Sequence, residues 1–181
     1  MGENTNENAP LFQVRSQTEV SAVPADVYAV ISDLPRSGEW SPECLGGEWI
    51  SGAPGAVGAV FRGENLRSEE VVSWAPVVRG KWHTHAEIVA AEPGRTFRWA
   101  MHDSTGTPQD SVWAFDIEPA GPAGSVLVHH FRMGAATEGI RGITAEMDAA
   151  EKQKFFTDWA GKLEHDLAET LGRIKLVIEK N

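Results

Sequence analysis

The chain has 181 residues, of which 41% are hydrophobic, and this composition is typical of a globular protein with one domain. Its formal net charge is −10, which argues against a nucleic-acid partner or an anionic membrane surface, because both attract clustered Lys and Arg. The single cysteine, Cys44, excludes an intrachain disulfide and favours a reducing, cytoplasmic location. No signal peptide is expected, and no apolar run approaches the roughly 18 residues of a transmembrane helix.

Residues 1–11 are predicted to be a disordered N-terminal tail, because they are polar and rich in Asn and Glu. Residues 12–181 are predicted to be a single domain. Side chains alternate from Phe12 to Val20, which predicts a strand with one wetter face. Pro24 then favours a helix start, because its missing N–H costs nothing at the first helical position. This short helix is expected to end before Pro35.

Turn sequences rich in Gly and Pro separate the next segments, each of which has a strand-like composition. The predicted strands are residues 47–51, 58–65, 80–91, 95–102, 110–118 and 125–133. Their close spacing favours antiparallel hairpins over crossover connections. Residues 68–78 are ambiguous between an edge strand and a covering loop, because Pro76 interrupts them.

In the last segment the alternation of the strands ends, and large apolar residues recur every three or four positions. They are Phe155, Trp159, Leu163, Leu167, Leu171, Ile174 and Ile178. This spacing predicts one long amphipathic helix over residues 145–179. The predicted sheet is the only surface long enough to cover its apolar stripe.

Four segments in this order resemble the START-like superfamily, also called the SRPBCC or helix-grip fold. They are VSAVPADVYAVISDLPRSGEWSPE (20–43), GAVGAVFRGEN (55–65), EPGRTFRW (92–99) and the final helix. The resemblance implies an α+β fold, in which a curved antiparallel sheet of about seven strands wraps round a long C-terminal helix. It also implies two short helices at the mouth of a cavity. The superfamily includes polyketide aromatase/cyclases, lipid-transfer START domains and the birch-pollen-allergen family.

The stretch DLPRSGEWSPE, residues 33–43, is expected to form the second of these mouth helices. Pro35 ends the first helix, and Gly38 permits a sharp bend. Trp40 can then turn inward as an apolar lid whose indole N–H needs a partner. The alternative, that Trp40 only plugs the end of the core, stays open. In both cases the stretch shapes a cavity mouth and performs no chemistry.

Trp82, Trp99 and Trp113 each lie in the middle of a predicted strand, where alternation groups them with other apolar residues on one face. If that face is concave, flat aromatic walls suit a large, planar or polyunsaturated apolar ligand. A plain packed core is the alternative. The predicted ligand-binding residues are Trp40, Phe61, Trp82, Phe97, Trp99, Met101, Trp113, Phe115, His129, Phe131 and Trp159.

The sequence HTHAE places His83, His85 and Glu87 on one side of a strand. An HxH pair can bind a metal when a neighbouring strand supplies a third ligand. The opposite side carries the apolar residues, however, so the His side is predicted to face solvent. No metal is therefore expected. No cofactor is expected either, because the glycine-rich GAPGAVGAV lies between strands, whereas a dinucleotide site needs a strand followed by a helix. His129 shares its face with apolar residues and is the best candidate for a buried titrating group.

No Ser–His–Asp or Cys–His pattern indicates a catalytic site, and Cys44 has no obvious base. In related cyclases a pocket Arg acts with other polar groups to orient a polyketide and help it enolise. The resemblance makes Arg62, Glu64 and His129 the candidate polar pocket groups here.

In size, layout, aromatic-rich strands and lack of a clear catalytic group, the chain also resembles enediyne (calicheamicin-type) self-sacrifice resistance proteins. Such proteins lose a backbone hydrogen to a ligand diradical, and glycine Cα–H bonds are the least shielded. The candidate cleavage glycines are Gly46, Gly47, Gly52, Gly55, Gly58 and Gly63.

The sequence is consistent with three functions. The first is binding of a bulky hydrophobic natural product, giving antibiotic self-resistance by sequestration or self-sacrifice. The others are a polyketide aromatase/cyclase and a carrier of lipids or other hydrophobic ligands. The expected partner is a hydrophobic small molecule, with neither nucleic acid nor membrane, and the chain is expected to be a monomer or weak dimer.

Overall fold

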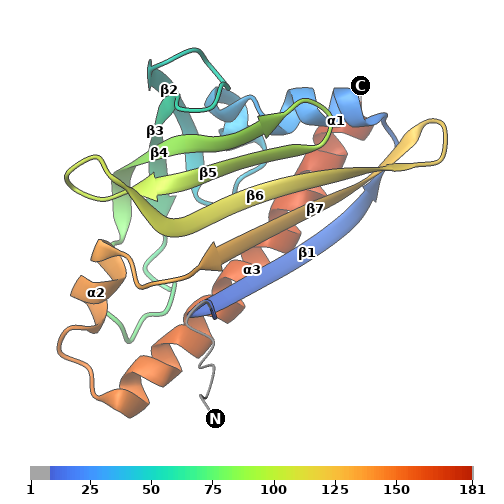
Figure 1. The fold of residues 1–181 in the computed structure, drawn as a ribbon. Coiled ribbons are helices and arrows are strands. Elements are labelled where there is room, and N and C mark those ends of the chain that lie inside the picture. The colour runs from blue at the N-terminus through green and yellow to red at the C-terminus, as the bar shows by residue number, and fades with distance from the viewer. Residues whose placement is uncertain (1–8, 181) are drawn as a thin grey trace, which may run out of the picture.

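A computed structural model describes residues 9–180, so most of the predicted tail lies outside the described part of the chain. The strands are β1 (Phe12–Val20), β2 (Cys44–Ser51), β3 (Val60–Arg67), β4 (Gly80–Glu92), β5 (Thr96–His102), β6 (Pro108–Ala120) and β7 (Gly124–Met133). They form one seven-stranded sheet in the order β1-β7-β6-β5-β4-β3-β2, and all neighbours are antiparallel. The sheet curves around a long C-terminal helix (Figure 1).

The helices are α1 (Pro24–Ile31), the 3-10 helix η1 (Leu34–Glu39), α2 (Glu138–Thr144) and α3 (Ala149–Glu179). Helix α3 begins at Ala149 rather than at residue 145. A capping box stops it there, because the Asp148 carboxylate accepts the Glu151 N–H and the Glu151 carboxylate accepts the Asp148 N–H, both at 2.9 Å. The residues that precede it form α2 and a turn instead.

Helix α2 was not predicted from the sequence. Gly139 and Gly142 lie within it, and glycine in a short helix disfavours helix formation. The Thr137 side chain nevertheless accepts the Ile140 N–H at the N-terminus, and Ile140 and Thr144 are buried. Capping and tertiary packing therefore stabilise a helix that its own residues support weakly.

The ambiguous residues 68–78 form a loop, because no part of this segment is paired in the sheet. Arg79 holds the loop together by donating hydrogen bonds to several of its carbonyl groups. The acceptors are Glu69 (3.2 Å), Val71 (2.9 Å), Val72 (2.9 Å), Ala75 (3.1 Å) and Val77 (3.0 Å). One guanidinium thus satisfies backbone groups that a strand would have paired with its neighbour.

Two buried clusters pack α3 against the rest of the molecule. The C-terminal half of α3, through Leu171 and Ile174, packs with α1, η1 and the sheet. Its N-terminal half, through Phe155 and Leu163, packs with β1, β7, α2 and the loop 68–79. The predicted apolar stripe of the helix is thus buried from Phe155 to Ile174, and its last residue, Ile178, is partly buried.

Candidate functional site

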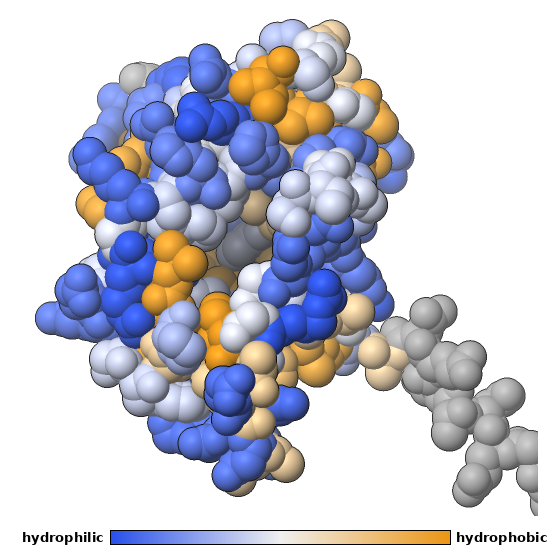
Figure 2. Space-filling view, turned by 90° about the vertical axis from the view of Figure 1, so that its left-hand side faces the viewer, coloured by the Kyte–Doolittle hydropathy of each residue, from blue (hydrophilic) through white to orange (hydrophobic). Residues whose placement is uncertain are grey.

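A cavity of about 560 Å³ lies between the concave face of the sheet and α3, and it is lined by residues from both buried clusters. Figure 2 shows that one face of the molecule is hollowed near its centre, within a surface of mixed hydrophilic and hydrophobic residues. This volume is within the range of small-molecule binding sites. The cavity is therefore the candidate site.

Aromatic side chains from adjacent strands form much of the cavity wall. Trp82, Trp99 and Trp113 line it from β4, β5 and β6. Trp99 and Trp113 are directly paired across β5 and β6, so their rings are neighbours on the concave face. The other predicted ligand-binding residues found in the lining are Trp40, Phe61, Met101, Phe131 and Trp159.

Three predicted ligand-binding residues lie outside the cavity lining. Phe97, Phe115 and His129 pack against Trp99 in the core and are at most 3% exposed. The His129 ring stacks on Phe115, with centroids 3.9 Å apart, and its Nδ1 lies 2.9 Å from the Ala114 carbonyl oxygen. Burial lowers the pKa of His129 to about 4, so the ring is neutral. His129 is therefore a packed core histidine, and the expectation that it reaches the cavity is corrected.

The other candidate catalytic residues, Arg62 and Glu64, point away from the cavity. Arg62 lies 3.9 Å from Glu48, and Glu64 lies 3.7 Å from His83, with all four side chains at least 37% exposed. Phe61 and Gly63, which line the cavity, alternate with them along β3. Since successive side chains of a strand face opposite sides, Arg62 and Glu64 are on the convex face and are not pocket groups.

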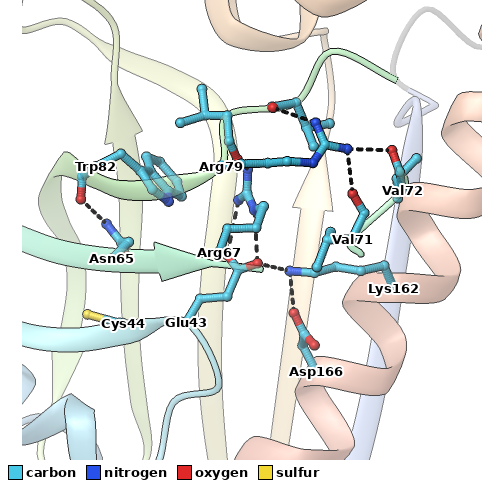
Figure 3. A network of polar contacts seen from close by, with 12 residues as sticks. Glu43, Cys44, Asn65, Arg67, Val71, Val72, Arg79, Trp82, Lys162 and Asp166 are labelled. Carbon is cyan, nitrogen blue, oxygen red and sulfur yellow. Dashed lines mark hydrogen bonds and ion pairs between the residues drawn. The ribbon is translucent and has the colours of Figure 1, made fainter. Parts of the chain in front are cut away.

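The polar residues that line the cavity include a charged cluster of Glu43, Arg67, Lys162 and Asp166 (Figure 3). Arg67 donates to both oxygens of Glu43, at 2.9 and 3.0 Å. Lys162 lies 2.5 Å from Glu43 and 2.5 Å from Asp166. No side chain of the cluster is more than 18% exposed. The cluster therefore places two cations and two carboxyl groups in the wall of an otherwise largely apolar cavity.

Aromatic rings enclose the arginine of this cluster. The Arg67 guanidinium carbon lies 4.6 Å from the centre of the Trp82 ring and 5.0 Å from the centre of the Trp159 ring. Arg67 also donates to the Val78 carbonyl at 3.1 Å. These contacts hold the guanidinium in one position, because cation–π contacts and hydrogen bonds act on different parts of it.

The pKa values of the two carboxyl groups of the cluster are shifted in opposite directions. Burial acts to raise the pKa of Glu43, but the hydrogen bond from Arg67 and the charge of Lys162 together hold it below its usual value. Burial raises the pKa of Asp166, and Lys162 only partly offsets this. The negative charge of Glu43 also raises the pKa of Asp166. Glu43 is thus the stable anion of the cluster, and Asp166 is the group that more readily takes up a proton.

Sequence reasoning missed the charged cluster, although two weak signals were present. Arg67 has the same parity along β3 as Phe61 and Gly63, which predicts the concave face. Lys162 and Asp166 are one helical turn apart, beside the apolar stripe of α3. Glu43 carries no local signal, because it precedes β2 in an irregular segment.

Smaller polar groups complete the lining near β2. The Asn65 amide donates to Thr84 Oγ1 at 3.1 Å, and Ser37 Oγ lies 3.1 Å from Cys44 Sγ. All four residues line the cavity. These two pairs of side chains therefore interact within the wall itself.

Among the candidate cleavage glycines, Gly63 lines the cavity. A Cβ added at Gly63 would lie 3.0 Å from Thr84 Oγ1, so this position has little room for a side chain. The others, Gly46, Gly47, Gly52, Gly55 and Gly58, lie in β2 or in the β2–β3 connection and are not among the lining residues. Their expected position at the cavity is thus corrected.

His83 and His85 have exposed side chains on β4, as the alternation of that strand predicts. Within residues 9–180, no group of three or more His, Cys, Asp and Glu is arranged to hold a metal ion. In the same part of the chain, no helix has the length and apolar character needed to cross a membrane.

Solved structures share the architecture. The Polyketide_cyc-like protein Cgl2372 from Corynebacterium glutamicum is 27% identical, with a TM-score of 0.58 over 92% of this chain and 91% of that chain. The Zhui aromatase/cyclase from Streptomyces sp. R1128 is 13% identical, with a TM-score of 0.64 over 93% and 94%. Protein CV1439 from Chromobacterium violaceum is 16% identical, with a TM-score of 0.55 over 93% and 98%. The START-like helix-grip fold predicted from the sequence is confirmed by these likenesses.

A family model extends the likeness from the fold to the sequence. The model for polyketide cyclase / dehydrase and lipid transport proteins matches residues 12–179, which is nearly the whole chain. No curated protein matches the chain significantly. The chain therefore belongs to the polyketide cyclase / dehydrase and lipid transport family.

Proposed function

We propose that this protein binds a bulky, planar, hydrophobic natural product in the cavity between the sheet and α3. The observation that carries the proposal is the aromatic wall formed by Trp82, Trp99 and Trp113 around a space of about 560 Å³. Large aromatic surfaces gain most from contact with a flat apolar ligand. The family description, which covers polyketide cyclases and lipid transport, also supports a hydrophobic small molecule.

The proposal is tested by titrating the protein with planar tricyclic aromatic compounds and following tryptophan fluorescence. Binding is expected to quench emission with a one-to-one stoichiometry, because several indole rings line one cavity. Trp74 is the matched control, since it is 40% exposed and is not in the lining. Trp74→Phe should leave the affinity unchanged. Absence of saturable quenching by every planar ligand tested would overturn the proposal.

A narrower form of the proposal makes the ligand an enediyne of the calicheamicin type, with self-sacrifice cleavage of the backbone. It rests on the overall resemblance noted above, and Gly63 is the candidate glycine that lines the cavity. Mass spectrometry after incubation with an activated enediyne is expected to show one cleavage per molecule, next to Gly63. Intact protein after complete activation of the enediyne would exclude self-sacrifice and leave binding untouched.

A polyketide aromatase/cyclase is the second candidate function. The observation that favours it is a protonatable carboxyl group, Asp166, beside Lys162 in the cavity wall. Such a pair can transfer a proton to and from a ligand carbonyl. The test is multiple turnover of a poly-β-keto substrate, with a loss of about 10²-fold or more in Asp166→Asn. Binding without turnover would exclude the cyclase and would favour a resistance protein or a carrier of hydrophobic ligands.

A further inference from the structure

Two of the indole groups in the cavity wall have unsatisfied hydrogen-bond donors. Trp40 Nε1 and Trp82 Nε1 are buried, and neither has a hydrogen-bond acceptor among residues 9–180. Both residues line the cavity, Trp40 from the segment after η1 and Trp82 from β4. An indole nitrogen can only donate. Each therefore lacks the acceptor that a buried N–H normally has.

The fold itself does not explain why these positions carry an indole N–H. Trp40 packs edge-on against Phe115, with ring centroids 5.8 Å apart at 84°. The Trp82 ring lies under the guanidinium of Arg67 at 4.6 Å. Both contacts use the ring and not the nitrogen, so a phenylalanine would retain their main features. An unpaired buried N–H is moreover destabilising. The donors are accounted for if something that enters the cavity accepts from them.

We propose that Trp40 and Trp82 determine ligand specificity by donating their indole N–H groups to two separate acceptor oxygens of the ligand. The ligand class is then a planar polycyclic compound with carbonyl or quinone oxygens at different edges of the ring system. This inference rests on the proposed binding function and adds the polarity of the ligand to it. The rings of Trp99 and Trp113 line the same cavity and supply apolar contact with the ligand.

Binding must also move the two rings slightly. Each nitrogen is covered by protein atoms in the structure, so an acceptor reaches it only after the ring has turned. A ligand with acceptors is therefore expected to turn the Trp40 and Trp82 rings, whereas a ligand of the same shape without acceptors fills the cavity without turning them. This difference distinguishes hydrogen bonding from simple filling of the cavity.

The experiment compares anthraquinone with anthracene, which share a tricyclic outline and differ in the two carbonyl groups. Dissociation constants are measured for the unmodified protein and for Trp40→Phe, Trp82→Phe and Trp99→Phe. In the unmodified protein anthraquinone is expected to bind about tenfold or more tightly than anthracene, since two buried donors gain acceptors. Trp40→Phe and Trp82→Phe should each remove a large part of this preference. Trp99→Phe is the matched control and should weaken both ligands while keeping their ratio.

The outcomes separate this inference from the proposed function. If neither compound binds, the proposed function fails. If both bind with equal affinity, or if the preference survives in both Trp40→Phe and Trp82→Phe, the donor assignment is wrong and the binding function stands. Thermal unfolding checks that each variant folds. If Trp40→Phe does not fold, replacing Trp40 with benzothienylalanine keeps the bicyclic shape, removes the N–H and gives the same readout.

Discussion

Arg67 and Trp82 are in contact in the cavity wall, with the guanidinium carbon 4.6 Å from the centre of the indole ring. The same guanidinium donates to both oxygens of Glu43, which in turn binds Lys162 of α3. The contact thus belongs to a chain of interactions that connects the β2 edge of the sheet to the long helix across the cavity (Figure 3). The shape of the cavity depends on this connection, because the sheet and the helix form its opposite walls.

Replacing Glu43 with Gln is expected to lower the free energy of unfolding by about 3 kcal/mol. The change removes the anion between Arg67 and Lys162, and breaking a buried ion pair leaves charges without compensation. Urea denaturation measures the effect. Glu48→Gln is the control, because Glu48 is 69% exposed and its 3.9 Å contact with Arg62 contributes little. An equal, small effect in both variants would contradict a stabilising role for the cluster.

The contribution of Asp166 to the free energy of unfolding is expected to decrease as the pH rises. Burial raises its pKa in the folded state above the ordinary value of 3.8, so folding favours the protonated form. Its contribution to stability is complete below the unfolded pKa and is lost as the pH rises through the folded pKa. Asp166→Asn cannot titrate. Its free energy of unfolding, measured relative to the unmodified protein from about pH 3.5 to about pH 7, should therefore increase.

The difference between Asp166→Asn and the unmodified protein separates the pH effect of Asp166 from that of Glu43. The pKa of Glu43 is lowered, so its contribution is lost as the pH falls, which is the opposite trend. Glu43 is present in both proteins, and its effect largely cancels in the difference. A difference that stays constant with pH would show that Asp166 titrates alike in the folded and unfolded chains.

His129 is expected to make the protein acid-sensitive. Burial lowers its pKa from 6.5 to about 4, so the folded state prefers the neutral ring. Its contribution is therefore complete above pH 6.5 and is lost as the pH falls, and the loss reaches roughly 3 kcal/mol near pH 4. His129→Asn keeps a donor for the Ala114 carbonyl and cannot charge. Denaturation across this window should show a weaker pH dependence in the variant than in His85→Asn, the exposed control.

Trp99→Ala is expected to weaken the binding of a planar aromatic ligand by about 1–3 kcal/mol, as the loss of an aromatic anchor typically does. Trp99 lines the cavity and packs against Phe97 and Phe115, with centroids 5.9 and 5.8 Å apart. Calorimetric titration gives the affinity, and thermal unfolding gives the stability. Unchanged affinity together with lower stability would mean that Trp99 is only part of the packed core.

Untagged protein is expected to contain no stoichiometric zinc. His83 and His85 are exposed on β4, and within residues 9–180 no third His, Cys, Asp or Glu is arranged with them to hold a metal ion. A stable zinc site usually has at least three protein ligands. Elemental analysis tests this, with His83→Ala as a comparison. One zinc per chain that is lost in His83→Ala would contradict the prediction.

Much of the architecture could be predicted from the spacing of apolar residues along the sequence. Alternation along the strands placed Trp99 and Trp113 on one face, and the three-to-four spacing from Phe155 to Ile174 marked the buried side of α3. These periods are reliable because the backbone geometry of a strand or helix fixes which residues share a face. The start of α3 and the presence of α2 depended on caps and packing, which the apolar pattern alone does not reveal.

The polar part of the site was decided by the tertiary structure. Glu43, Arg67, Lys162 and Asp166 come from the entry to β2, the end of β3 and the middle of α3, and only the curvature of the sheet around the helix brings them together. His129 shows the same limit, since its alternation suggested the cavity but the ring of Phe115 stacks on it. The sequence by itself determined which residues share a face within each element. Which faces meet, and which side chains reach the cavity, depended on long-range packing, because contacts between distant elements leave no local period in the chain.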